Sequence, residues 1–306
     1  RMSKFLITIV GPTAIGKTSL AIKLAKKYKT EVISADSRQF YRELNIGTAK
    51  PSKDELSSVK HHLINNISVT DKYDISHFEA DARKIIDNLF KTKDYIILVG
   101  GSGLYIDTIL YGIDKMPNTE DSLRKRLNEE FENNGLKNLL AQLKKIDPVT
   151  YKNIDLSNHR RIIRALEVSI SSKKPYSSFL TNSVKASNYN EIIIGLNCDR
   201  DNLHSLINKR VDKMIKCGLI EEVKKLEKFK NLNALNTIGY KEIFDYLNNK
   251  TSLEESIEKI KTNSRRYAKR QLTYFNSNKK INWFENQYEI KNIIKLIESR
   301  NELLNN

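Results

Sequence analysis

The residues with the most definite chemistry form a loop near the start of the chain, Gly11 to Thr18, which reads GPTAIGKT. The loop matches the phosphate-loop pattern G-x-x-x-x-G-K-[ST] at every fixed position. In such loops glycines let backbone N–H groups point at a phosphate, and Lys17 and Thr18 stand where a lysine reaches the outer phosphate and a hydroxyl holds Mg²⁺. A plain Gly-Pro connection is the alternative, but the full match predicts a site for a di- or triphosphate.

Two more groups of polar residues each follow an apolar run. Asp36 comes after a short apolar run, and Ser102 lies in a glycine-rich segment directly after Tyr95–Val99. Because ligands bind beyond the carboxyl ends of parallel strands, we expect both side chains to lie beside Lys17. Asp36 could instead cap the following turn. The polar segment 36–51 has neither helical nor strand periodicity, which is typical of a functional loop.

The elements that must position these residues alternate between strand-like and helical patterns. Four runs have the length and composition of buried strands: Phe5–Val10, Glu31–Ala35, Tyr95–Val99 and Glu191–Leu196. Strands separated by helices or long crossovers predict an α/β fold with a P-loop NTPase-like parallel sheet. Residues 120 to 180 contain helical runs only, which indicates a helical insertion. We therefore expect a first part of the core (2–115), a helical insertion (116–186) and a completion of the core with basic C-terminal helices (187–306).

The charge balance favours a polyanionic partner. Lysine and arginine total 53 against 37 acidic residues, a net charge of +16, which a small-metabolite enzyme does not need. Lysine richness that reflects the base composition of the genome is the competing explanation. Residues 259–280, however, carry eight basic side chains and no acidic one, interleaved with Tyr267, Tyr274 and Phe275. Basic groups for phosphates and aromatic faces for unstacked bases favour looped or single-stranded RNA.

A second basic cluster lies in the predicted insertion. Arg160, Arg161 and Arg164 fall on one helical run, with Lys173 and Lys174 just beyond it. Residues three and four apart share a face of a helix, so these arginines could contact a phosphate backbone together. A solvated helix surface is the alternative.

Several other kinds of site are disfavoured. His61 and His62 are adjacent and have no third ligand nearby, so we interpret them as structural and not metal-binding. Cys198 and Cys217 are too few for a disulfide framework, and reduced thiols are typical of a cytoplasmic protein. No apolar run approaches the roughly 20 residues that span a bilayer, and the first residues lack the apolar core of a signal peptide. We expect no membrane partner.

Six blocks of the sequence resemble the tRNA dimethylallyltransferases, also called tRNA isopentenyltransferases. In order they are Gly11-Pro12-Thr13-Ala14-x-Gly16-Lys17-Thr18, Asp36-Ser37-x-Gln39-x-Tyr41-Arg42, Ile46-Gly47-Thr48-Ala49-Lys50-Pro51, Gly100-Gly101-x-Gly103-Leu104-Tyr105, Arg160-Arg161-x-x-Arg164-Ala165-Leu166-Glu167 and Lys269-Arg270-Gln271-x-Thr273. The phosphate loop alone is shared with many kinases, but the six blocks together cover Phe5 to about Phe275 and are highly specific. The sequence has no zinc-finger extension like that of some eukaryotic relatives, so the resemblance is to the bacterial type.

The resemblance implies a reaction and its partners. A dimethylallyl group would pass from dimethylallyl diphosphate to the exocyclic amine of the adenosine immediately 3′ of the anticodon. The fold would be nucleotide-kinase-like, with Mg²⁺ as cofactor and a helical insertion that grips the tRNA anticodon stem-loop. The phosphate loop would hold the pyrophosphate leaving group in place of ATP. We expect the enzyme to act as a monomer.

The resemblance also implies roles for individual residues. The catalytic residues would be Asp36 as general base, Ser102 where Thr is usual, and Arg210, which would contact the pyrophosphate. The diphosphate would be held by Gly11, Thr13, Ala14, Gly16, Lys17, Thr18 and Arg210, with Mg²⁺ on Thr18. The tRNA would be held by Ser37, Gln39, Arg160, Arg161, Arg164, Arg266, Lys269, Arg270 and Gln271. Tyr274 stands where Trp is usual in the family. Arg38 and Ile15 also replace commoner residues, and neither replacement puts an essential part of the resemblance in doubt.

The implied chemistry suits these residue types. An adenine amine is a poor nucleophile, so a carboxylate that takes its proton as the new bond forms assists the attack. The allylic carbon loses pyrophosphate with cation-like character, so cations must stabilise the leaving oxygens.

Two other functions are compatible with parts of the sequence. One is a P-loop small-molecule or nucleotide kinase, which would consume ATP. The other is an RNA-binding protein without catalysis, which the presence of both Asp36 and Lys17 disfavours.

Overall fold

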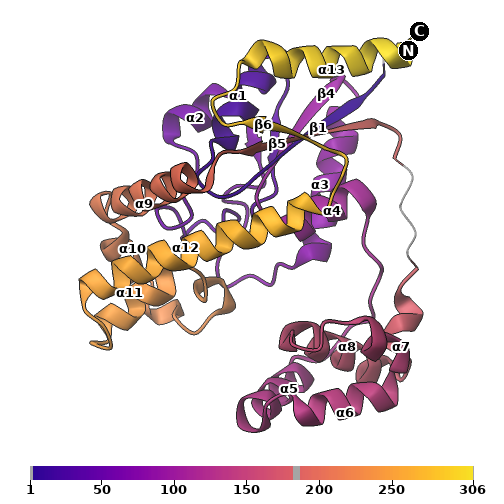
Figure 1. The fold of residues 1–306 in the computed structure, drawn as a ribbon, viewed down its shortest axis with the longest axis vertical. Helices are drawn as coiled ribbons and strands as arrows, with labels where there is room; N and C mark the ends of the chain where they lie inside the picture. The colour runs from indigo at the N-terminus through magenta and orange to yellow at the C-terminus, as the bar shows by residue number, and fades with distance from the viewer. Residues whose placement is uncertain (1–2, 182–186, 306) are drawn as a thin grey trace. The chain divides into compact units, whose positions relative to one another are not determined.

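The computed structural model describes residues 3–181 and 187–305 (Figure 1). The chain forms two compact units, one made of residues 1–110 and 186–306 and the other of residues 111–185. The helical unit therefore begins at 111, slightly before the position 116 expected from the sequence. The expected segment limits at 2, 186 and 306 lie outside the described residues.

The first unit is built on a parallel sheet with the strand order β3-β2-β4-β1-β5-β6. Its strands are β1 (Phe5–Val10), β2 (Val32–Ser34), β3 (His61–His62), β4 (Tyr95–Val99), β5 (Asn190–Asn197) and β6 (Ile281–Glu285). The four strands expected from the sequence are present at nearly the expected limits. The predicted α/β fold with a parallel core sheet is confirmed.

The two edge strands were not expected from the sequence. β3 contains only two residues, so it has no periodicity to detect, and His62 Nε2 lies 2.9 Å from Glu31. No group of three or more His, Cys, Asp or Glu side chains among the described residues is placed to hold a metal. β6 reads INWFE and pairs with β5, where a Cβ on Gly195 would lie 2.5 Å from the Trp283 ring. The absence of a side chain at Gly195 leaves space for the Trp283 ring.

The apolar side chains of β1 divide between the two faces of the sheet. All six residues of the strand are buried. Phe5, Ile7 and Ile9 pack in one cluster with helices α1 (Lys17–Lys27) and α13 (Ile290–Asn305). Successive side chains of a strand alternate, so Leu6 lies on the opposite face. A strand buried on both faces explains why its sequence is continuously apolar.

The remaining helices of this unit lie beside the sheet or belong to the C-terminal half of the chain. They are α2 (Lys53–Ser58), α3 (Ile75–Leu89), α4 (Gly103–Tyr111), α9 (Arg200–Lys216), α10 (Leu219–Lys225), α11 (Tyr240–Leu247) and α12 (Leu253–Asn276), with 3₁₀ turns at Glu227–Phe229 and Asn233–Leu235. The long helix α12 packs against α9 and α11 (Figure 1). Ser252 and Glu255 form a capping box that starts it.

The second unit is helical throughout its described residues, as the sequence predicts. It contains α5 (Asp121–Asn134), α6 (Lys137–Ile146), α7 (Pro148–Asn153), α8 (His159–Ser172) and a 3₁₀ turn at Tyr176–Phe179. It has its own apolar core, which includes Leu127, Leu139, Leu143, Ile162 and Leu166. Across the described part of the chain, no helix combines the length and apolar character needed to cross a membrane.

Candidate active site

The phosphate loop joins β1 to α1 in the geometry that its sequence predicts. Gly11 and Gly16 have φ values of +151° and +103°, which favour glycine, and a Cβ on Gly11 would lie 2.5 Å from the Leu196 carbonyl oxygen. Ala14 also adopts a positive φ, +67°. Helix α1 begins at Lys17, so Lys17 and Thr18 occupy its first turn. A helix N-terminus with a glycine-rich approach is a site for an anion.

Lys17 lies in the interior of this loop and not in solvent. Its Nζ donates to the carbonyl oxygens of Gly11 at 3.0 Å and Pro12 at 2.7 Å. Burial, and after it the charge of Arg210, lower the pKa of Lys17 to about 7, against the opposite effect of Asp36. A bound polyanion would return the ammonium to its charged form.

Arg210 comes from α9 and reaches the loop from a distant part of the sequence. Its Nη1 donates to the Thr13 hydroxyl at 2.8 Å, and its Nη2 donates to the Ala49 carbonyl at 3.4 Å. Burial lowers the pKa of this guanidinium, Asp36 raises it, and a second guanidinium, that of Arg38, lowers it. Three basic groups are thus brought near the phosphate loop, with Asp36 as the carboxylate beside them.

Asp36 and Ser102 lie where the ends of two neighbouring strands meet. β2 and β4 pair in parallel with Ser34 opposite Val99, so the residues that follow each strand come together. The Ser102 Oγ accepts the backbone N–H of Ser37 at 3.2 Å and lies 3.3 Å from the Ser37 Oγ. One carboxylate oxygen of Asp36 accepts the backbone N–H of Arg38 at 3.0 Å. The other oxygen has no hydrogen-bond partner among the described residues and can accept a proton from a substrate.

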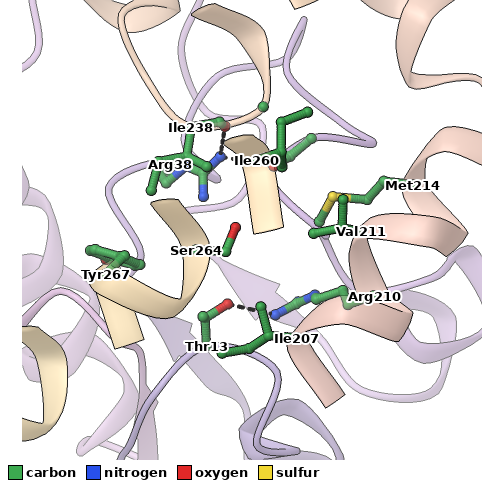
Figure 2. Close-up of a pocket in the computed structure, with 12 residues that line it drawn as sticks. Thr13, Arg38, Ile207, Arg210, Val211, Met214, Ile238, Ile260, Ser264 and Tyr267 are labelled. Atoms are coloured by element: carbon green, nitrogen blue, oxygen red, sulfur yellow. Dashed lines mark hydrogen bonds between the residues drawn. The ribbon is translucent and has the colours of Figure 1, made fainter. Parts of the chain in front are cut away.

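A pocket of about 380 Å³, part of it open to solvent, continues from the phosphate loop (Figure 2). Its polar groups are Thr13, Arg38, Arg210, Ser264 and Tyr267, and its apolar lining is Ile207, Val211, Met214, Ile238 and Ile260, with Gly47 and Gly239 completing the wall. Figure 2 shows the Arg210–Thr13 pair and the Arg38–Ile238 pair on different sides of this space. Cationic groups beside aliphatic side chains suit an anionic head group attached to a short apolar chain.

Comparisons with known proteins agree with this geometry. The family described as IPP transferase matches residues 39–278. The tRNA dimethylallyltransferase of Christiangramia forsetii is 50% identical over 299 residues, which cover 98% of this chain and 99% of the relative. This chain belongs to that family.

Two solved structures of the family have the same fold. The full-length tRNA isopentenylpyrophosphate transferase of Bacillus halodurans superimposes with a TM-score of 0.72 at 37% identity, covering 98% of this chain and 97% of that one. A eukaryotic dimethylallyltransferase described as acting on tRNA gives a TM-score of 0.77 at 27% identity, covering 93% and 74%. The P-loop, nucleotide-kinase-like core expected from the sequence is confirmed.

Two residues that the family resemblance assigns to tRNA lie inside the protein. Gln271 is 6% exposed; its Oε1 accepts the Thr13 backbone N–H at 2.8 Å, and its Nε2 donates to the Gly101 carbonyl at 3.1 Å. Gln39 is 8% exposed and donates to the Thr48 carbonyl at 3.2 Å. Both amides hold the loops of the site in this structure, and their contact with tRNA stays a prediction. Ser37 is likewise engaged, through its contact with Ser102.

The basic residues and the apolar residues of α12 lie on different faces of the helix. Arg266, Lys269 and Arg270 are exposed, whereas Ala268 and Phe275 are buried. Tyr267 lines the pocket, and the Tyr274 hydroxyl donates to Asp107. The helical period therefore places the cations toward solvent, where a phosphate backbone could bind them. Tyr267 lines the pocket, and a stacking contact of its ring with an RNA base stays a prediction.

The basic cluster of the helical unit also divides in two. Arg160 and Arg161 are exposed at the start of α8. Arg164 lies 3.4 Å from the buried carboxylate of Glu167, which also accepts from Arg124 at 2.8 Å. A buried carboxylate needs such partners, so Arg164 has a structural role in addition to any contact with RNA.

Sequence reasoning missed the residues that shape the loop between β2 and α2. Glu222, on α10, accepts the backbone N–H groups of Asn45 and Ile46 at 3.0 Å and of Gly47 at 3.2 Å. It also accepts the hydroxyl of the fully buried Tyr240 at 2.7 Å. Nothing in the local sequence distinguishes this glutamate from the acidic residues beside it. The glycine at position 47 is the one residue of this loop whose type reflects the contact, because a Cβ there would lie 2.5 Å from the Tyr240 ring.

Proposed function

We propose that this chain transfers the dimethylallyl group of dimethylallyl diphosphate to the exocyclic amine of the adenosine immediately 3′ of the anticodon in tRNA. One observation carries the proposal: at the Arg210–Thr13 hydrogen bond the phosphate loop borders a pocket that combines cationic and aliphatic side chains (Figure 2). We assign the diphosphate to the phosphate loop and its five-carbon chain to the aliphatic side chains of this pocket. The family named tRNA dimethylallyltransferase, to which the chain belongs, supports the choice of substrates.

Each residue of the site has an assigned role in the reaction. The amine nitrogen attacks the first carbon of the dimethylallyl group, the bond from that carbon to the diphosphate oxygen breaks, and pyrophosphate departs with both electrons. Lys17 and Arg210 balance the charge that develops on the departing oxygens. Asp36, at the end of β2, takes the proton that the amine loses, as general base. Ser102 fixes Ser37 in the same segment and so positions Asp36.

The apolar lining of the pocket also serves the chemistry. We assign Ile207, Val211 and Ile260, which line the pocket, to contact with the dimethylallyl group. Exclusion of water from this space protects a cation-like carbon from hydrolysis. The target adenine must leave its stack to reach the pocket, which a nucleotide in an anticodon loop does at lower cost than one in a duplex.

Mg²⁺ fits the residues present at the phosphate loop. Mg²⁺ keeps several waters and takes one or two protein ligands together with phosphate oxygens. The Thr18 hydroxyl, in the first turn of α1, is the protein ligand we assign, and oxygens of the diphosphate and of water would supply the other ligands. When bound, the metal would neutralise charge on the leaving group.

Other parts of the proposal concern the state of the enzyme. We place it in the cytoplasm, where tRNA is its substrate, and the two cysteines of the described residues are free thiols. We propose that it acts as a monomer, because all the assigned donor-site residues come from one chain. Contact with the anticodon stem-loop is assigned to Arg160 and Arg161 in the helical unit and to Arg266, Lys269 and Arg270 on α12.

The proposal is tested by incubating the protein with dimethylallyl diphosphate and unmodified tRNA and then digesting the tRNA for mass analysis. We expect isopentenyladenosine in place of one adenosine, with stoichiometric release of pyrophosphate. ATP should be neither required nor hydrolysed. ADP released in step with turnover, and no prenylated nucleoside, would instead identify a P-loop kinase.

A further inference from the structure

Arg38 brings a second guanidinium into the donor pocket. It lines the same space as Thr13 and Arg210 but comes from the segment after β2, whereas Arg210 comes from α9 (Figure 2). In the sequence Arg38 is only a replacement of a commoner residue. Its position in the pocket places its positive charge where a bound ligand would contact it.

The guanidinium of Arg38 is held in place by two backbone carbonyl groups. Its Nη2 donates to Gly47 at 2.8 Å and to Ile238 at 2.5 Å. The first of these acceptors is itself fixed, because Glu222 binds the N–H of Gly47 and is bound by the Tyr240 hydroxyl. A charged group that is held before the ligand arrives loses little entropy when the ligand binds.

The rest of this guanidinium is not satisfied within the protein. Its Nε is buried and has no hydrogen-bond partner among the described residues. Buried donors are nearly always paired, so an unpaired one on a residue that lines a pocket points to a ligand beside that residue. Among the same residues no carboxylate forms an ion pair with Arg38. Burial lowers the pKa of Arg210, Asp36 raises it, and the charge of Arg38 lowers it. Lys17, Arg38 and Arg210 thus bring three basic groups to this site against the one carboxylate of Asp36, and that balance favours an anionic ligand.

We propose that Arg38 is a second guanidinium ligand of the donor diphosphate, with its guanidinium donating to a phosphate oxygen while Arg210 and Lys17 bind the same group. The inference rests on the proposed function, because it assumes that the anion in the pocket is the diphosphate of the prenyl donor. Pyrophosphate gains negative charge as it leaves, so a third fixed cation stabilises the transition state as well as the bound donor.

The alternative is that Arg38 only ties its segment to Gly47 and Ile238. Two variants separate the roles. Arg38→Gln removes the charge but keeps an amide that can donate to a carbonyl, and Arg38→Lys keeps the charge but removes Nε. Arg200→Gln is the matched control, because Arg200 is exposed at the far end of α9 from Arg210. It removes one positive charge without touching the pocket.

The experiment is isothermal titration of each folded variant with inorganic pyrophosphate and Mg²⁺, with thermal unfolding measured alongside. We expect Arg38→Gln to raise the Kd at least tenfold, Arg38→Lys to raise it about threefold or more, and Arg200→Gln to leave it within twofold. A lower Tm with an unchanged Kd in both Arg38 variants would show a structural tie only and overturn the inference. If Arg38→Gln is too unstable to titrate, an unchanged Kd in Arg38→Lys is enough to overturn it.

Failure of the proposed function has a different signature. If the wild-type protein binds pyrophosphate and Arg210→Ala weakens that binding while Arg38→Gln does not, only the role of Arg38 is wrong. If the wild-type protein fails to bind pyrophosphate and forms no prenylated tRNA, the proposed function itself is overturned.

Discussion

The side chain of Gln271 closes the phosphate loop from the other end of the chain, because its Oε1 accepts the Thr13 backbone N–H at 2.8 Å. The same amide donates to the Gly101 carbonyl at 3.1 Å, so one residue of α12 joins the segments that follow β1 and β4. α12 also carries Arg266 and Lys269 on its exposed face. The helix to which we assign tRNA contact therefore also supports the phosphate loop.

This contact predicts that Gln271 acts on the donor and not on tRNA. Gln271→Ala should raise the Kd for pyrophosphate about tenfold, because it leaves the Thr13 N–H without its acceptor and loosens the loop. The Kd for tRNA, measured by filter binding, should change less than twofold. The exposed neighbour Thr273 provides the control, with Thr273→Ala expected to affect pyrophosphate binding by less than twofold. A selective loss of tRNA affinity in Gln271→Ala would restore the role implied by the family resemblance.

Asp36 is expected to be required for the chemical step alone. Asp36→Ala should keep the fold and the affinity for tRNA but lower kcat by ~10²-fold or more, since the amine then has no base. Single-turnover formation of isopentenyladenosine measures this step directly. Asp87→Asn, on the exposed face of α3, is the control for loss of one carboxylate. Turnover within threefold of wild type in Asp36→Ala would exclude Asp36 as the base.

Lys17 should lower the stability of the ligand-free protein at neutral pH. The unfolded chain keeps a proton on this lysine up to about pH 10.5, but the folded chain keeps it only up to about pH 7. The unfolded state therefore binds more protons between these values, so stability rises with pH across that window, and the full cost is present below pH 7.

The variant Lys17→Met tests this relationship. We expect its Tm to exceed that of wild type by a few degrees at pH 6.5, and the gap to shrink by pH 9. The variant should also lose the rise in Tm that pyrophosphate causes in the wild-type protein. If the difference in Tm does not depend on pH, burial of the charged Lys17 ammonium does not destabilise the protein as inferred here.

Arg160 and Arg161 are expected to bind phosphates of tRNA. The double variant Arg160→Gln, Arg161→Gln should raise the Kd for tRNA more than tenfold and reduce the slope of log K against log salt by about 1.5 units. Arg266→Gln with Lys269→Gln should act in the same direction. Neither pair should alter pyrophosphate binding.

A matched control separates position from net charge. Arg200→Gln with Arg300→Gln removes the same two charges from exposed sites outside both clusters. If this control weakens tRNA binding as much as the Arg160–Arg161 pair does, only the overall charge of +16 matters. If the pair has no effect, the start of α8 is a solvated surface.

Much of the donor site could be predicted from the sequence because its parts are local or follow from a general property of parallel sheets. The geometry of the phosphate loop depends on consecutive residues, so the spacing from Gly11 to Thr18 was enough. Asp36 and Ser102 each follow an apolar strand, and parallel strands deliver their carboxyl ends to one edge.

Only the tertiary structure decided which polar side chains face inward. A helical period shows that Gln271 and Ala268 share a face of α12, but not which face meets the phosphate loop. Residue type does not distinguish a buried, paired amide such as Gln271 from one that reaches tRNA. Arg38 and Glu222 owe their roles to contacts across about two hundred residues of sequence, Arg38 with Ile238 and Glu222 with Gly47. Such contacts depend on how the helices pack, because shape and burial determine the partner of each side chain. The residues adjacent in sequence therefore do not predict that partner.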